Sequence, residues 1–263
     1  MSRKIIFSDI DGTLINSKNE VTLKTRESLR KQIINGNLFV PVSARMPKGI
    51  MTAAGQVTQA CPIIAYNGAL VLDETGYPLN SQFMSSDIAV KVCNYVEEHS
   101  TLLWNVYSGY NWLAPKNTNS WFAREEKKMG TKALTASIKS IKNLKGVHKI
   151  LIAGGPKQLD DLKPNLETRF IELDFVKSAP TLLEATIKGV SKSKGIEILA
   201  KEFNISLKEC WAFGDNYNDV EMLKTVGHPV VMENAPDDIK KSFTYITSDN
   251  NHDGIAKALG DFI

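Results

Sequence analysis

Cysteine is scarce in this sequence of 263 residues. The three cysteines, Cys61, Cys93 and Cys210, lie far apart, and no Cys-x-x-Cys pair occurs. An odd number of widely separated cysteines is neither a disulfide framework nor a zinc-binding pattern. The scarcity therefore indicates a reducing compartment, and we expect a cytoplasmic location.

Long apolar runs and an excess of charge are also missing. The longest apolar runs, such as 38–42 and 62–66, are far shorter than the roughly 18 residues of a membrane helix, and the stretch after Lys4 is too short for a signal peptide. Lys and Arg number 32 and Asp and Glu 29, a net charge of +3, and no basic run marks a nucleic-acid contact. We therefore expect no membrane and no nucleic acid among the partners, while the oligomeric state leaves no mark on the sequence.

The two ends of the chain alternate between strand-like and helix-like segments. Short apolar runs predict strands at 4–8, 38–42, 62–66, 210–214 and 229–232, a hairpin over 69–79 and an edge strand at 245–246. Apolar residues at helical spacing predict helices at 22–35, 47–56, 192–203, 220–225, 236–242 and 253–259. Strands that alternate with helices form parallel sheets, so both ends predict one Rossmann-like α/β core.

Residues 83–186 have a different pattern and contain three of the four tryptophans. Helix-like stretches at 87–99, 131–141 and 158–169 mix there with strand-like stretches at 102–107, 110–114, 149–153, 173–178 and 181–185. The mixture predicts an α+β unit inserted into the core. The predicted fold class is therefore α/β, with a parallel-sheet core of residues 1–82 and 187–263.

Two carboxylates follow the first predicted strand. Asp9 and Asp11 come directly before Gly12 and Thr13, and a period of two would place both carboxylates on one side at the carboxyl end of the strand, where open parallel sheets bind ligands. Carboxylates this close repel unless a cation lies between them. Mg²⁺ prefers such oxygen ligands, so the motif predicts a magnesium site.

A second acidic motif follows the strand predicted at 210–214. Asp215 comes at the strand end, and Asp219 lies four residues later in the first turn of the next helix. Helix capping explains one Asp or Asn well. It does not explain two Asp together with Asn216 and Asn218 beside Gly214, so the motif favours a second contribution to a cation site.

Two further positions offer groups for an anion. Ser43 follows the second strand and could hold an anion at a helix N-terminus, although a helix-start role is the usual reason for a serine at such a position and is favoured when Ser43 is taken alone. Lys192 and Lys194 begin a helix, where a cation opposes the helix dipole and a bound anion would offset that cost. For one lysine taken alone, simple exposure to solvent is the better explanation. The two acidic motifs, Ser43 and the lysines at the helix start all lie at one edge of the predicted sheet, and together they suit phosphoryl transfer.

The sequence motifs typical of dinucleotide binding, of α/β-hydrolases and of P-loop nucleotide hydrolysis are missing from the chain.

The order and spacing of these motifs resemble the haloacid dehalogenase superfamily. Asp9-Ile10-Asp11-Gly12-Thr13 resembles its first motif, Ser43 its second, the Lys192 region its third and Gly214-Asp215 to Asp219 its fourth. The long insert, and Asn67-Gly68 before a hairpin, resemble the Cof-like type IIB phosphatases. The resemblance implies that the insert is a cap that sets substrate specificity.

The resemblance also implies a mechanism. Asp9 would attack phosphorus to form an aspartyl-phosphate, and Asp11 would act as the acid and base. Mg²⁺ would be held by the Asp9 carboxylate, the Asp11 backbone carbonyl and Asp215. The phosphate oxygens would be held by the Ile10 amide, Ser43, the Ala44 amide, Lys192 and Asn218. Asp219 would support the metal waters or the lysine.

The third motif departs from the family pattern, which often has Lys-Gly before the helix. Here the sequence is Lys192-Ser193-Lys194-Gly195. Gly195 favours Lys194, whereas the register of the following apolar residues favours Lys192, and we expect Lys192 to be the functional lysine.

The predicted function is a Mg²⁺-dependent phosphatase of small phosphorylated metabolites, sugar phosphates first. A phosphomutase of the same fold and a non-catalytic regulator that binds a phosphorylated metabolite are the alternatives, and release of phosphate from a monophosphate distinguishes them.

Overall fold

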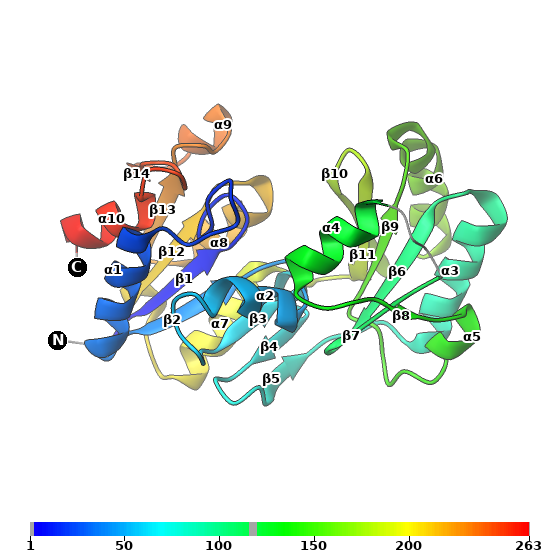
Figure 1. Ribbon diagram of the computed structural model, residues 1–263, viewed down its shortest axis with the longest axis horizontal. Helices are drawn as coiled ribbons and strands as arrows, with labels where there is room; N and C mark the ends of the chain where they lie inside the picture. The colour runs from blue at the N-terminus through cyan, green and yellow to red at the C-terminus, as the bar shows by residue number, and fades with distance from the viewer. Residues whose placement is uncertain (1–2, 116–119, 263) are drawn as a thin grey trace. The chain divides into compact units, whose positions relative to one another are not determined.

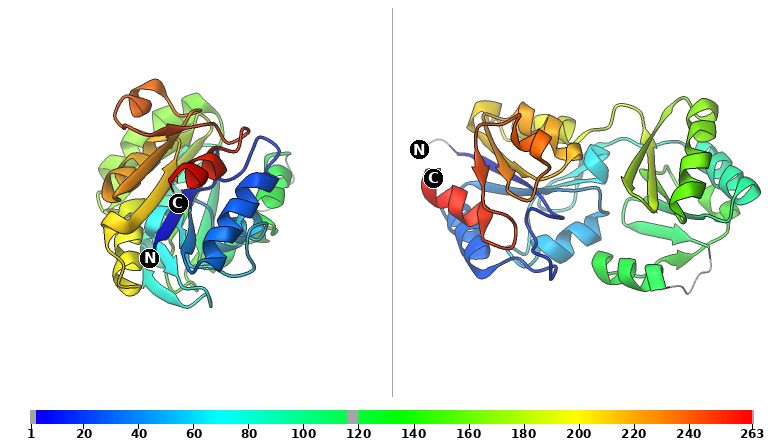
Figure 2. Two further views of the ribbon diagram at one scale, coloured as in Figure 1. Left: turned by 90° about the vertical axis from the view of Figure 1, so that its left-hand side faces the viewer. Right: turned by 90° about the horizontal axis from the view of Figure 1, so that it is seen from above.

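The chain folds into two compact units. The computed structural model describes residues 3–115 and 120–262, and Figures 1 and 2 show its ribbon. A core unit comprises Met1–Asn80 and Ser191–Ile263, and an inserted unit comprises Ser81–Val190. The limits expected from the sequence, 83 and 186, lie just inside these positions.

The core unit is built on one sheet of strand order β14-β13-β12-β1-β2-β3-β4-β5. The parallel strands are β1 (Ile5–Asp9), β2 (Leu38–Val42), β3 (Ile63–Ala65), β12 (Cys210–Gly214), β13 (His228–Met232) and β14 (Ile246–Thr247). The edge is completed by β4 (Leu70–Leu72), which is antiparallel to β3, and by β5 (Pro78–Ser81). The expected parallel-sheet core is confirmed.

Helices cover both faces of the core sheet (Figures 1 and 2). One face carries α1 (Leu23–Ile34), α2 (Pro47–Ala54) and α10 (Gly254–Phe262), and the other carries α7 (Lys192–Glu202) and α8 (Val220–Thr225). The short α9 (Asp237–Lys240) follows β13. Because side chains alternate along β1, Ile5 and Phe7 pack with Ile196 and Leu199 of α7 in one apolar cluster.

The inserted unit has its own sheet, of strand order β10-β11-β9-β6-β7-β8. Its strands are β6 (Leu103–Ser108), β7 (Asn111–Ala114), β8 (Leu134–Thr135), β9 (Lys149–Ala153), β10 (Leu173–Ala179) and β11 (Leu182–Ile187). Apolar side chains of α3 (Ser86–His99), α5 (Ile138–Ile141) and α6 (Pro156–Arg169) pack with one face of this sheet. On the other face Trp112 of β7 stacks on Tyr107 and on Phe122 of α4 (Ser120–Met129).

The helix predicted at 131–141 is wrong over most of its length, and only its end, α5 (Ile138–Ile141), is helical. Leu134 and Thr135 form β8 beside Leu113 and Ala114 of β7, and Ala136 donates its N–H to the Ala114 carbonyl at 2.8 Å. Pairing with a sheet edge therefore overrides the helical spacing of the apolar residues. The helix α4, which precedes this segment, was not expected.

No helix in the described part of the chain is long and apolar enough to cross a membrane. The three cysteines are buried and free.

Candidate active site

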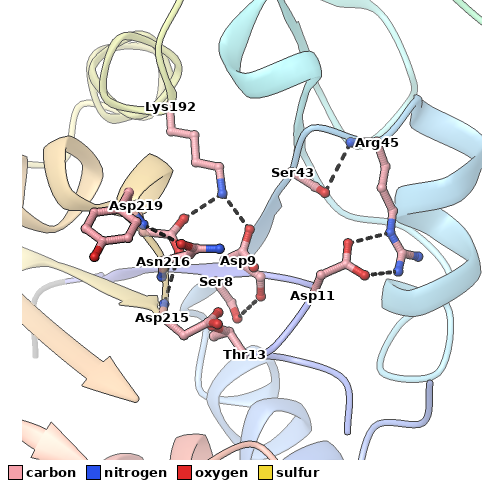
Figure 3. A network of polar contacts seen from close by, with 11 residues as sticks. Ser8, Asp9, Asp11, Thr13, Ser43, Arg45, Lys192, Asp215, Asn216 and Asp219 are labelled. Atoms are coloured by element: carbon pink, nitrogen blue, oxygen red, sulfur yellow. Dashed lines mark hydrogen bonds and ion pairs between the residues drawn. The ribbon is translucent and has the colours of Figure 1, made fainter. Parts of the chain in front are cut away.

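The two acidic motifs meet at the carboxyl edge of the core sheet (Figure 3). β1 and β12 are neighbours, with Ser8 beside Phe213, so the residues that follow each strand come together. Asp9, the last residue of β1, is 6% exposed. The parallel pairing of two strands about 200 positions apart in the sequence therefore creates the site.

A single lysine bridges the two motifs. Lys192 Nζ donates to Asp9 Oδ1 at 2.5 Å and to Asp219 Oδ1 at 2.6 Å (Figure 3). Lys192 is the first residue of α7 and only 2% exposed, whereas Lys194 is exposed. The structure therefore places Lys192, rather than Lys194, in the acidic site. Gly195 has a packing reason instead, because its Cα lies against the Ile64 side chain.

Asp219 is fully engaged by the protein. Its Oδ2 accepts hydrogen bonds from the backbone N–H groups of Asp215 and Asn216, both at 3.0 Å, and its Oδ1 accepts from Lys192. Asn216 caps the same turn, Tyr217–Asp219, in a reciprocal capping box. Both oxygens of the buried Asp219 are thus occupied, and its role in this geometry is to hold Lys192.

Asp215 lies beside the first loop. Its Oδ1 accepts from Thr13 Oγ1 at 2.7 Å, and its Oδ2 accepts from Asn234 Nδ2 at 3.2 Å. Gly12 has a φ of +89°, and a Cβ at this position would overlap the Asp215 carboxylate. Only glycine permits this approach of the loop. Asn234, which also donates to the Gly12 carbonyl at 2.9 Å, was not identified from the sequence.

The charges of this cluster are unbalanced. One oxygen each of Asp9, Asp215 and Asp219 lies within 4.8 Å of the others, and Lys192 is paired with two of these carboxylates, Asp9 and Asp219. Burial raises the pKa of Asp9 well above its usual value against the opposing effect of Lys192, and burial raises that of Asp215 to about 6. Burial alone would lower the pKa of Lys192, but Asp219 and Asp9 outweigh it and the pKa is raised. Three carboxylates with one ammonium fit a divalent cation, and oxygen donors suit Mg²⁺.

The Asp11 side chain does not lie beside Asp9, contrary to the expectation from a period of two. Arg45 Nε and Nη2 donate to the two Asp11 carboxylate oxygens at 2.9 and 2.6 Å (Figure 3). The chain turns directly after β1, so the alternation of a strand no longer holds at Asp11. The acidic cluster contains Asp219 in place of the Asp11 carboxylate.

Arg45 is a site residue that sequence reasoning missed. Its side chain is 5% exposed, and Nη1 donates to the Gly49 carbonyl at 3.2 Å while the two other nitrogens hold Asp11. The available signal was a charged residue two positions after Ser43, between a buried strand and the helix that follows. Its bidentate geometry fixes the direction of the Asp11 carboxylate.

The remaining predicted residues lie at the same carboxyl edge of the core sheet and differ in how deeply they are buried. Ser43 is buried, and its Oγ accepts from the Arg45 N–H at 3.2 Å. Ala44 follows it in the loop, half-buried, and Ile10 is buried with a carbonyl that accepts from Leu14 at 3.1 Å. Asn218 is exposed in the turn that precedes α8.

The sequence profile of the haloacid dehalogenase-like hydrolases matches residues 6–259 of the chain. The chain belongs to this family. A putative phosphatase of Haemophilus influenzae is 31% identical to this hydrolase over 98% of both chains. The family therefore covers the core and the insert alike.

Solved structures agree with this assignment. A haloacid dehalogenase-like hydrolase from Bacteroides thetaiotaomicron has a TM-score of 0.93 and 26% identity over the whole of both chains. A sugar phosphatase of subclass IIB, BT4131, has a TM-score of 0.83 over 98% of both chains, and at 22% identity it shows the fold alone. The hydrolase thus has the architecture of the Cof-like type IIB group that the motifs resemble.

Proposed function

We propose that this hydrolase is a Mg²⁺-dependent phosphatase that cleaves phosphomonoesters of small metabolites. The observation that carries the proposal is Lys192 Nζ held between Asp9 and Asp219 beside Asp215. A buried ammonium next to a buried carboxylate suits a phosphoryl group, since positive charge stabilises its equatorial oxygens while the carboxylate attacks.

Mg²⁺ would be held by the Asp9 carboxylate, the Asp11 backbone carbonyl and Asp215. When bound, the ion would offset the charge of the phosphoryl oxygens and favour the ionised form of Asp9. Thr13 and Asn234 orient the two oxygens of Asp215, as partners of metal ligands commonly do.

Asp9 is the proposed nucleophile. One of its carboxylate oxygens forms a bond to phosphorus as the bond to the leaving oxygen breaks, and Asp11 gives the leaving oxygen a proton. Water then attacks the aspartyl-phosphate and gives its proton to Asp11, which restores Asp9 and releases phosphate. Because Arg45 holds both oxygens of Asp11, one of them must leave Arg45 before it can reach the leaving group.

The other polar groups at the edge would hold phosphate oxygens. Lys192, Ser43 Oγ and the N–H groups of Ile10 and Ala44 are the proposed contacts, and Asn218 is the exposed one. Lys192 stays charged in this role because two carboxylates face it.

The inserted unit is the proposed specificity domain, and sugar phosphates are the first class of substrate to test. A sugar phosphatase shares the fold, and the family model covers the insert as part of the same enzyme. We place the enzyme in the cytoplasm on its cysteine content.

Phosphate release from a panel of sugar and nucleotide monophosphates, with Mg²⁺ and with EDTA, tests the proposal. We expect release that depends on Mg²⁺ and is lost in Asp9→Asn. A protein that moves phosphate between two positions of one sugar without releasing it would be a phosphomutase, and a protein that binds the panel without turnover would be a regulator. Undiminished turnover in a metal-stripped sample would contradict the metal site.

A further inference from the structure

The turn that follows β3 has an unusual backbone. Tyr66, Asn67 and Gly68 have φ values of 53°, 55° and 106° in succession. The other described residues with positive φ that are not glycine are Asn or Asp, which tolerate this region, whereas a tyrosine there is strained. In addition, the Asn67 Oδ1 atom is buried without a hydrogen-bond partner among the described residues. Such unfavourable features persist where the surrounding structure requires them.

One side of the turn is bonded to the loop that carries Ser43. The Asn67 N–H donates to the Ser43 carbonyl at 2.9 Å, and the Tyr66 N–H donates to the Arg45 carbonyl at 3.2 Å. The Ser43 N–H in turn donates to the Ile64 carbonyl at 2.9 Å. The left-handed backbone therefore extends the pairing of β2 and β3 past the ends of both strands, along the loop of the proposed phosphate contacts.

The other side of the turn touches the start of α7. Gly68 lies so close to the Ser191 carbonyl that a Cβ at position 68 would overlap the carbonyl oxygen, and it would lie 3.5 Å from the Lys192 nitrogen. Ser191 is the N-cap of α7, and Lys192 is its first residue. No flexible side chain intervenes at this contact, since both partners are backbone.

We infer that the Tyr66–Gly68 turn is a positioning element that sets the distance between Ser43 and Lys192, with Gly68 as its essential residue. The inference rests on the proposed phosphatase function. No side chain of the turn is among the groups proposed above to react or to hold phosphate. The turn connects the two backbone segments that present the hydroxyl and the ammonium to one phosphate, and close packing transmits its position to both. An error of about 1 Å in such a group can reduce the rate by about 100-fold.

Gly68→Ala tests the inference with Gly36→Ala as its matched control. Gly36 has a φ of +87° and no atom within 4 Å of a built Cβ, and it lies at the amino end of β2, away from the site. Both variants carry the backbone strain of alanine at positive φ, so both should lower the melting temperature. Only Gly68→Ala should displace Lys192.

The assay uses p-nitrophenyl phosphate, with inorganic phosphate as a competitive inhibitor, at a temperature where circular dichroism shows both variants folded. We expect Gly68→Ala to lower kcat/KM by at least about tenfold and to raise the inhibition constant of phosphate, with Gly36→Ala close to wild type. Similar values of kcat/KM and of the phosphate inhibition constant in the two variants would overturn the inference. An inactive wild type would overturn the phosphatase function and the inference together.

A double-mutant cycle separates positioning from a general loss of structure. If Gly68 acts through Lys192, adding Gly68→Ala to Lys192→Ala should lower kcat/KM little further, while the loss of melting temperature persists. Effects on kcat/KM that multiply would contradict action through the lysine. Should Gly68→Ala fail to fold, Asn67→Gly takes its place, because glycine adopts this backbone freely and loosens the turn. An unchanged kcat/KM in that variant would overturn the inference.

Discussion

Each unit of the chain buries a lysine against carboxylates, but the two lysines are balanced differently. In the inserted unit Lys149 Nζ lies 3.4 Å from Glu184 Oε1 and 5.2 Å from the centre of the Tyr107 ring, with the two charged side chains 5% and 11% exposed. In the core unit Lys192 faces Asp9 and Asp219, with Asp215 close by.

The difference separates a balanced ion pair from a cluster with excess negative charge. Among the described residues, the Lys149 ammonium has a carboxylate and an aromatic face as partners, and these offset its buried charge. One ammonium with three carboxylates leaves excess negative charge, so the folded site gains from a bound cation. Excess buried charge, rather than buried charge as such, therefore marks the candidate active site.

The largest expected effect is the loss of turnover in Asp9→Asn. An amide cannot attack phosphorus, so phosphate release should fall below detection while circular dichroism stays that of the wild type. Glu184→Gln is the matched change in the other cluster, and at a temperature where it is folded it should still turn over substrate. Turnover near that of the wild type in Asp9→Asn, with Mg²⁺ present, would remove Asp9 as the nucleophile.

The two lysines at the start of α7 should differ by orders of magnitude. Lys192→Ala should lower kcat/KM by about 100-fold to 1,000-fold, because it removes a charge that stabilises the transition state. Lys194→Ala should stay within about twofold, since Lys194 is exposed. Steady-state kinetics of the two variants give the comparison, and the reverse order would reassign the third motif to Lys194.

Loss of the Lys149–Glu184 ion pair in the inserted unit should lower the stability of the protein more than its turnover. Glu184→Gln removes the carboxylate partner of a buried ammonium and should lower the free energy of unfolding by about 3 kcal/mol. The double variant Lys149→Met/Glu184→Leu should recover most of that loss, because it leaves no buried charge at the pair. Urea unfolding measures both, and a loss below about 1 kcal/mol in the single variant would show that the pair is effectively solvated.

The smallest expected effect is a pH dependence of the metal-free protein. The pKa of Asp215 is raised from 3.8 to about 6 by burial. Its protonated form therefore contributes stability that is fully present below pH 3.8 and is lost as the pH rises through about 6. Without Mg²⁺, the unfolding free energy of the wild type relative to Asp215→Asn should therefore fall as the pH rises from 3.8 through about 6. Saturating Mg²⁺ should reduce this fall, because the ion favours the ionised carboxylate. A difference that does not vary with pH would contradict the raised pKa.

The positions of Asp9, Asp215 and Lys192 follow from patterns that are local in the sequence. Each follows a buried apolar strand or starts a helix with a clear apolar register, and parallel strands end at one edge of a sheet. The direction of the Asp11 carboxylate could not be predicted in this way, because it depends on Arg45, which is 34 residues away along the chain. For the same reason β8 was taken for a helix, since its pairing with β7 has no local signature.

The sequence by itself determined the α/β core, the inserted α+β unit and the residue types at the edge of the core sheet, because apolar periodicity and turn residues act over a few neighbouring positions. The tertiary structure alone decided which charges meet. Lys192 lies between Asp9 and Asp219 because parallel pairing of β1 and β12 brings two distant loops under the first turn of α7. Arg45, Asn234 and the turn at Gly68 act through contacts of a few ångströms between distant segments, and a linear pattern carries no information about such contacts.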